Sequence, residues 1–193
     1  MKSKYSGDIR IIEGSLDVKY GKDKVIFIDH LNDLFAADVP DHMILSVLNH
    51  CLDYPDNKYV FQTKNPQRYL EFRTSLPDDV ILGTTIESNR RHDCMGETPS
   101  PMLRAVGIRD AFATLGHETF ITIEPILDFD VKDFAELIIY ALPSFVNIGA
   151  DSKGHGLIEP SYDKIMELYN LLIDAGIEVR KKLNLDRLAK EFQ

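Results

Sequence analysis

The sequence predicts an α/β protein, a partial (β/α) barrel of about six parallel strands. Short apolar runs rich in β-branched residues alternate along the chain with longer segments of helical periodicity. Such alternation is typical of a parallel sheet with right-handed crossovers. No reversal in the order of the repeats is visible, which favours a partial barrel over a doubly wound sheet.

Each strand is expected to be a buried run that stops at loop or turn residues. The runs lie at residues 25–29, 59–63, 80–85, 119–124, 145–149 and 177–181.

The helical segments between these strands carry apolar stripes and terminal signals. They lie at residues 41–54, 66–75, 99–115, 131–142 and 161–175. We expect Asp41 to cap the first helix and Pro66 to open the second, while Gly176 ends the last. His50 is expected on the surface of the first helix.

A length of 193 residues predicts a single domain over residues 1–193, in which residues 1–24 form an irregular N-terminal segment. The net charge of −9 argues against general nucleic-acid binding. No apolar stretch approaches the roughly 18 residues of a membrane span, and no secretory signal is visible. These observations predict no membrane association and a cytoplasmic protein.

The tripeptide Thr-Ile-Glu occurs twice, each time where an apolar run ends. The first copy holds Thr85 and Glu87, and the second holds Thr122 and Glu124. Residues two apart on a strand share a face, so each Thr and its Glu should point the same way. Carboxylates at strand ends are costly unless they are paired, which favours a functional interpretation.

Polar side chains follow the other strands as well. They include Asp29, Asn32, Asp33, Gln62, Thr63, Lys64, Asn147, Asp151, Lys181 and Lys182. The carboxyl ends of parallel strands meet at one edge, where α/β active sites lie. This mixture of carboxylates and lysines suits a small polar ligand that carries both amine and carboxylate groups. The simpler alternative is that these residues cap helices and pair with one another.

Several of these segments resemble a radical-SAM-like family of unknown function that occurs in phages, bacteria and archaea and is distantly similar to spore photoproduct lyases. The resemblance runs in order from about Lys2 to Leu188. It rests on residues 32–40 (NDLFAADVP), 61–66 (FQTKNP), 82–87 (LGTTIE), 122–126 (TIEPI) and 147–154 (NIGADSKG).

The resemblance implies a partial (β/α) barrel in which a Cys-x-x-x-Cys-x-x-Cys triplet holds a [4Fe–4S] cluster that binds S-adenosylmethionine (SAM). It also implies that several strand-end residues line the cofactor or substrate side. These are Thr63, Lys64, Thr85, Glu87, Glu124 and Asp151.

The cysteine triplet is absent, because Cys51 and Cys94 are the only cysteines and stand far apart. Thiolates hold such clusters, so we expect no cofactor and no metal site in this chain as given. The resemblance implies a chain that begins late, with its first strand missing. It is a truncated chain, one with a misassigned start, or a naturally short form, and the sequence leaves these alternatives open.

A missing first strand would leave residues 25–29 as a sheet edge with unpaired backbone groups, unless residues 9–18 cover it. We therefore expect either a homodimer through the edge from Val25 to Asp29 or a local rearrangement of the N-terminal segment.

Three functions follow. The first is a radical-SAM-fold protein of unknown substrate that has no radical activity by itself. The second is a cluster-free lyase or aldolase-like barrel with Lys64 as Schiff-base nucleophile. The third is a non-catalytic domain that binds a partner, a small molecule or a nucleoside-like ligand.

Overall fold

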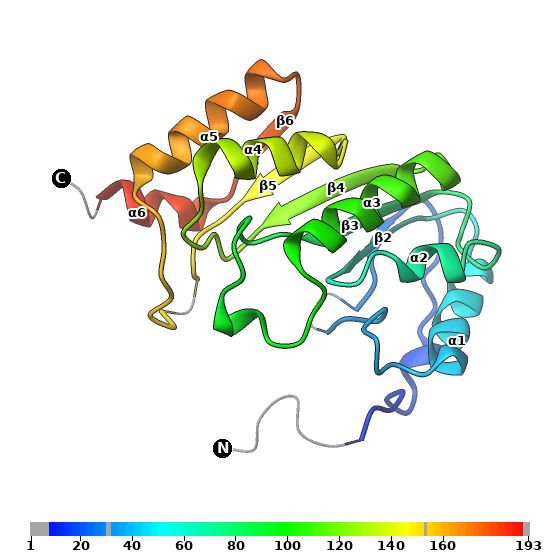
Figure 1. Ribbon diagram of the computed structural model, residues 1–193. Helices are drawn as coiled ribbons and strands as arrows, with labels where there is room; N and C mark the ends of the chain where they lie inside the picture. Colours follow the sequence, from blue (N-terminus) through cyan, green and yellow to red (C-terminus); the bar gives the residue numbers. More distant parts are fainter. Residues whose placement is uncertain (1–7, 30–31, 153, 191–193) are drawn as a thin grey trace.

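The computed structural model describes residues 8–29, 32–152 and 154–190. Its centre is a six-stranded parallel sheet whose order follows the chain from β1 to β6. The strands are β1 (Val25–Phe27), β2 (Lys58–Thr63), β3 (Val80–Thr85), β4 (Glu118–Ile123), β5 (Phe145–Ile148) and β6 (Glu178–Lys181). The sequential order confirms the predicted partial barrel, and Figure 1 shows α3, α4 and α5 side by side across one face of the sheet.

Four of the five helices between the strands lie close to their predicted positions, whereas the second is much shorter than the predicted 66–75, because residues 72–75 form turns. The five helices are α1 (Asp41–Leu52), α2 (Arg68–Glu71), α3 (Pro101–Leu115), α4 (Val131–Tyr140) and α5 (Tyr162–Asp174). Ser161 caps α5 by accepting a hydrogen bond from the Lys164 amide, and Gly176 follows the helix with a φ of 82°, as its position predicts.

Two predicted helix starts are wrong. Pro40 occupies the N-cap position of α1, and Asp41 is the first helical residue, with a carboxylate 2.6 Å from the Arg68 guanidinium. Because Asp41 lies inside the helix and its carboxylate pairs with Arg68, no side chain in the described part of the chain caps this helix end. The second helix begins at Arg68 and not at Pro66, because residues 65–67 form turns before it.

The core forms between the sheet and its helices. Side chains of β2 alternate in burial, so Tyr59 and Phe61 face the helices while Gln62 faces the inner side. The Tyr59 hydroxyl donates to the Cys51 carbonyl at 2.9 Å, and the Tyr69 hydroxyl donates to the Gly83 carbonyl at 2.8 Å. These bonds satisfy polar groups inside an otherwise apolar layer.

Within residues 8–24, the chain forms one 3-10 turn, η1 (Ser15–Asp17), and no strand. Tyr20 packs edge-on against His50, with ring centroids 4.8 Å apart. His50 Nε2 lies 2.9 Å from the Val18 carbonyl oxygen. His50 is therefore buried, and its expected surface position is wrong because the N-terminal segment covers that face of α1.

The β1 edge has a neighbour on one side only among the described strands. Val25 is 70% exposed there, and residues 9–18 add no strand beside it.

After β6, the chain forms η3 (Leu183–Leu185) and α6 (Asp186–Lys190), which the sequence pattern did not indicate. This segment brings Asn184 to the carboxyl end of the sheet. Among the described residues, no helix is both long and apolar enough to cross a bilayer.

Candidate functional site

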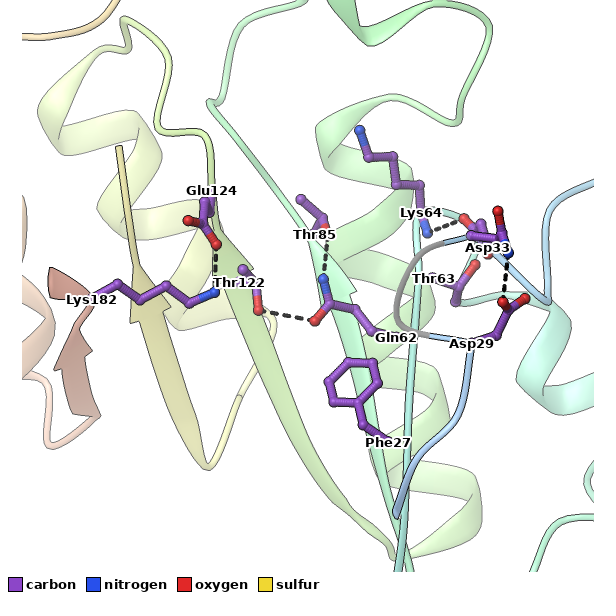
Figure 2. A pocket seen from close by; sticks show the side chains of 11 residues that line it. Phe27, Asp29, Asp33, Gln62, Thr63, Lys64, Thr85, Thr122, Glu124 and Lys182 are labelled. Carbon is purple, nitrogen blue, oxygen red and sulfur yellow. Dashed lines mark hydrogen bonds and ion pairs between the residues drawn. The ribbon is translucent and has the colours of Figure 1, made fainter. Parts of the chain in front are cut away.

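A cavity of about 460 Å³ opens at the carboxyl ends of the strands (Figure 2). Its walls come from β1, β2, β3 and β4 and from the loops that follow β1, β2, β4 and β6. The lining residues are Phe27, Asp29, Asn32, Asp33, Gln62, Thr63, Lys64, Thr85, Thr122, Glu124 and Lys182. The cavity brings together Thr63, Lys64, Thr85 and Glu124, four of the predicted site residues.

At the centre of the cavity, one amide connects three strands. Gln62 Nε2 donates to Thr85 Oγ1 at 2.8 Å, and Thr122 Oγ1 donates to Gln62 Oε1 at 3.2 Å. Thr85 and Thr122 are register partners on β3 and β4, which places both hydroxyls at the same height. The ring of Phe27 projects beside Gln62 and is 43% exposed (Figure 2).

The end of the cavity near β1 and β2 is acidic. Asp33 Oδ2 accepts the backbone N–H of Lys64 at 2.8 Å, and Asp29 Oδ1 accepts from Asn32 Nδ2 at 2.8 Å. Burial raises the pKa of Asp33 above its ordinary value, and hydrogen bonds from Thr63, Lys64 and Phe35 only partly offset the effect. No salt bridge joins Asp29 or Asp33 to a lysine or arginine in the described part of the chain.

The end near β4 and β6 is balanced in charge. Glu124 forms an ion pair with Lys182, and its other oxygen accepts from Asn184 Nδ2 at 2.6 Å. Gly149 makes room for this arrangement, because a Cβ there would lie 2.9 Å from the Glu124 carboxyl carbon and 3.0 Å from Asn184 Oδ1. The glycine is required for close approach of these side chains.

Glu87 is buried and is not one of the residues that line the cavity. Its carboxylate is 2.6 Å from Lys64 Nζ and 2.7 Å from Arg104 Nη1, and its side chain is 3% exposed. Burial alone would raise the pKa of Glu87, but the charges of Lys64 and Arg104 outweigh burial and hold the pKa below its ordinary value. Of Thr85 and Glu87, only Thr85 lines the cavity, and the Glu87 carboxylate pairs with the two cations.

Arg104 is the residue of this cluster that the sequence analysis missed. Its guanidinium also donates to the Thr85 carbonyl at 2.9 Å and to the Pro99 carbonyl at 2.7 Å, so it ties α3 to the end of β3. An arginine among the apolar residues of the helix that follows the strand-end carboxylate Glu87 is the signal that was available for it.

Lys64 contributes its backbone N–H to Asp33 and directs its ammonium toward Glu87. A Schiff-base nucleophile needs a neutral amine that faces the substrate. An ion-paired ammonium is a poor starting point for that chemistry, so this geometry does not favour the aldolase-like interpretation.

Asp151 stands apart from the cavity. Its carboxylate accepts the backbone N–H of His155 at 2.5 Å and lies 2.8 Å from His155 Nδ1, while its own N–H donates to Glu159. Arg187 pairs with Glu159 at 2.6 Å. Asp151 thus organises the loop between β5 and α5, a role that its position in the sequence alone does not reveal.

The site therefore belongs to a parallel α/β half-barrel that carries its polar groups at the strand ends. By sequence, the chain belongs to the family described as protein of unknown function (DUF5131), whose profile matches residues 6–139.

Among solved structures, the chain is similar to a radical SAM methyltransferase from Sphaerobacter thermophilus, with a TM-score of 0.53 and 14% sequence identity. The match covers 83% of this chain and 51% of that chain, so the chain spans about half the length of that structure. The likeness establishes a radical-SAM-like fold. A search of curated proteins found no match.

An iron–sulfur cluster does not fit the cysteines of this chain. Cys51 packs into the core on α1, and burial raises the pKa of its thiol to about 12. Cys94 is exposed on a one-turn 3-10 helix, η2 (Asp93–Met95), in the segment after β3. Among the described residues, no three His, Cys, Asp or Glu side chains form a group that could hold a metal ion. Three thiolates at short spacing are what a [4Fe–4S] cluster requires.

Proposed function

We propose that this chain is a radical-SAM-fold protein that binds a small, polar, nucleoside-like ligand in the strand-end cavity and carries no iron–sulfur cluster on its own residues. The observation that carries the proposal is the convergence of carboxylate, hydroxyl, amide and ammonium groups from successive strands on one cavity of about 460 Å³. Cavities of this size, with a few convergent polar groups, are typical ligand sites.

Each part of the cavity suits a different part of such a ligand. Asp29 and Asp33 line the cavity and form no salt bridge within the described residues, and their carboxylates suit an amine. Thr85, Thr122 and Gln62 offer neutral hydrogen-bonding groups to a sugar or base. Lys182 suits a carboxylate at the opposite end, where its ammonium already contacts Glu124.

SAM and its analogues are the first candidates because the fold resembles that of radical SAM proteins. The fold alone does not define a substrate, since one fold hosts many chemistries. We propose a binding role, and no radical chemistry, for the residues that line the cavity. The predictions that the chain is truncated or naturally short, and that its relatives occur in phages, stay predictions of the sequence.

The binding test uses the purified chain with SAM, S-adenosylhomocysteine, adenosine and methionine, followed by calorimetry and thermal shift. We expect at least one nucleoside to bind, and we expect Glu124→Gln or Asp33→Asn to weaken it. Glu71→Gln, which changes an exposed carboxylate on α2, is the matched control and should bind as the unmodified chain does. Absence of binding for the whole series would contradict the proposal.

We also propose that the chain associates with a second copy of itself and that it is cytoplasmic. The open β1 edge supports association with a second copy of the chain. Two unpaired cysteines, one of them exposed, support a reducing cytoplasmic location.

A further inference from the structure

The orientation of the Gln62 amide fixes the hydrogen-bonding roles of both threonines. Nε2 has only hydrogens to offer, so Thr85 Oγ1 must accept from it. Oε1 has only lone pairs, so the Thr122 hydroxyl must donate to it. Each hydroxyl has one proton, and Thr122 has therefore committed its proton while Thr85 has not.

These roles determine which hydrogen-bonding groups each hydroxyl can still offer to a ligand. Thr85 keeps its hydroxyl proton and can act as a donor, whereas Thr122 keeps lone pairs and can act as an acceptor. In the described part of the chain, no other side-chain hydrogen bond engages either hydroxyl. Both residues line the cavity, although they are only 6% and 5% exposed, so a ligand that reaches them enters a nearly dry place.

The spacing of the two hydroxyls matches a planar amide edge. Neighbouring strands lie about 4.8 Å apart, and Thr85 and Thr122 are direct partners across β3 and β4. Gln62 demonstrates the match, since the nitrogen and oxygen of its single amide bond both hydroxyls at 2.8 and 3.2 Å. Phe27 lies beside the amide and adds an apolar side chain to this part of the cavity wall (Figure 2).

We propose that the Gln62–Thr85–Thr122 array selects planar ligands that present a hydrogen-bond acceptor next to a donor, such as a carboxamide or the lactam or amidine edge of a heterocyclic base. The acceptor faces Thr85 and the donor faces Thr122. This inference rests on the proposed ligand-binding function and names the chemical class that the cavity takes.

Gln62→Glu is the sharpest test because it changes the roles without changing the shape. A carboxylate accepts from both hydroxyls, so Thr85 loses its free proton and both threonines then offer only lone pairs. Benzamide presents an acceptor beside a donor, whereas phenylurea can also present two N–H donors on one edge. Benzamide binding should fall about tenfold, the worth of one hydrogen bond, while phenylurea stays within about twofold.

Ligand-observed NMR competition with these two probes supplies the affinities. Thr85→Val and Thr122→Val should each weaken benzamide about tenfold, and Thr85→Ser should restore its binding. If circular dichroism shows that Gln62→Glu does not fold, the benzamide affinities of the valine and serine variants still test the proposal.

Equal benzamide affinity in the unmodified chain, Gln62→Glu and Thr85→Val would overturn the selection rule. If nucleosides bind but benzamide does not, the rule alone fails. If neither nucleosides nor benzamide bind the unmodified chain, the proposed function fails together with it.

Discussion

Arg104 and Glu87 form an ion pair of 2.7 Å in which the two side chains are 0% and 3% exposed. The pair joins α3 to the loop after β3, and Glu87 also contacts Lys64, which lines the cavity. Burial of two charges is costly, so the pair is stable only because each charge meets its partner and further hydrogen bonds.

Glu87→Gln should destabilise the fold by about 3 kcal/mol, because it leaves the buried Arg104 guanidinium without its counter-charge. Urea denaturation measures the change. Glu71→Gln alters an exposed carboxylate 3.5 Å from Arg68 and should cost less than about 1 kcal/mol. Similar losses for both variants would contradict the structural role given to the buried pair.

Stability should fall in acid as Glu87 becomes protonated. The folded-state pKa of Glu87 lies below its ordinary value of 4.5, so its contribution is present above that value and is lost as the pH drops through the folded-state pKa. Unfolding free energies measured from about pH 6 to pH 3 should decline less steeply in Glu87→Gln than in the unmodified chain. Parallel curves would show that Glu87 does not drive the acid sensitivity.

Gly149→Ala should displace the Glu124 carboxylate and disturb its contacts with Lys182 and Asn184. The added Cβ would come within 2.9 Å of that carboxylate, and overpacking of this kind costs about 1–3 kcal/mol. The free energy of unfolding, measured by denaturation, and the affinity for nucleosides should both decrease. In an Asn184→Ala background the effect of Gly149→Ala should shrink, because one of the two crowded groups is gone, and strict additivity would argue against this contact.

Reconstitution with iron and sulfide should give no cluster absorption in the visible range. Cys51 is buried with a raised pKa and Cys94 is exposed on the short 3-10 helix η2, so the chain lacks three thiolates at ligand spacing. The variant Cys51→Ala/Cys94→Ser should give the same spectrum. A cluster that forms in the unmodified chain and disappears in this variant would overturn the assignment.

Val25→Pro should dissociate any dimer formed through β1 without unfolding the protein. Lys24 and Ile28 bond to β2, and the alternation along a parallel strand directs the Val25 N–H toward the open edge. Light scattering of the unmodified chain and of the variant gives the oligomeric state. A monomer at all concentrations in the unmodified chain would remove the edge as an interface.

Much of the fold followed from local patterns. The strands and four of the five helices between them lie where β-branched runs and apolar stripes predicted them, because side-chain periodicity is a property of neighbouring residues. The boundary errors at Asp41 and Pro66 arise where a distant arginine or a turn replaced local capping.

The site was less predictable, because its hydrogen bonds join residues far apart in the chain. The sequence identified polar groups at the strand ends, and Thr63, Lys64, Thr85 and Glu124 do meet in one cavity. It did not show that Gln62 would connect Thr85 to Thr122.

By itself, the sequence determined the parallel α/β architecture, the edge at which polar groups gather and the lack of cysteines for a cluster. Tertiary structure decided which of those groups line the cavity. The Glu87 carboxylate pairs with Arg104, and the Asp151 carboxylate accepts a hydrogen bond within its own loop, because a buried carboxylate takes the position where donors satisfy it. That choice depends on contacts between strands, loops and helices, which local patterns do not encode.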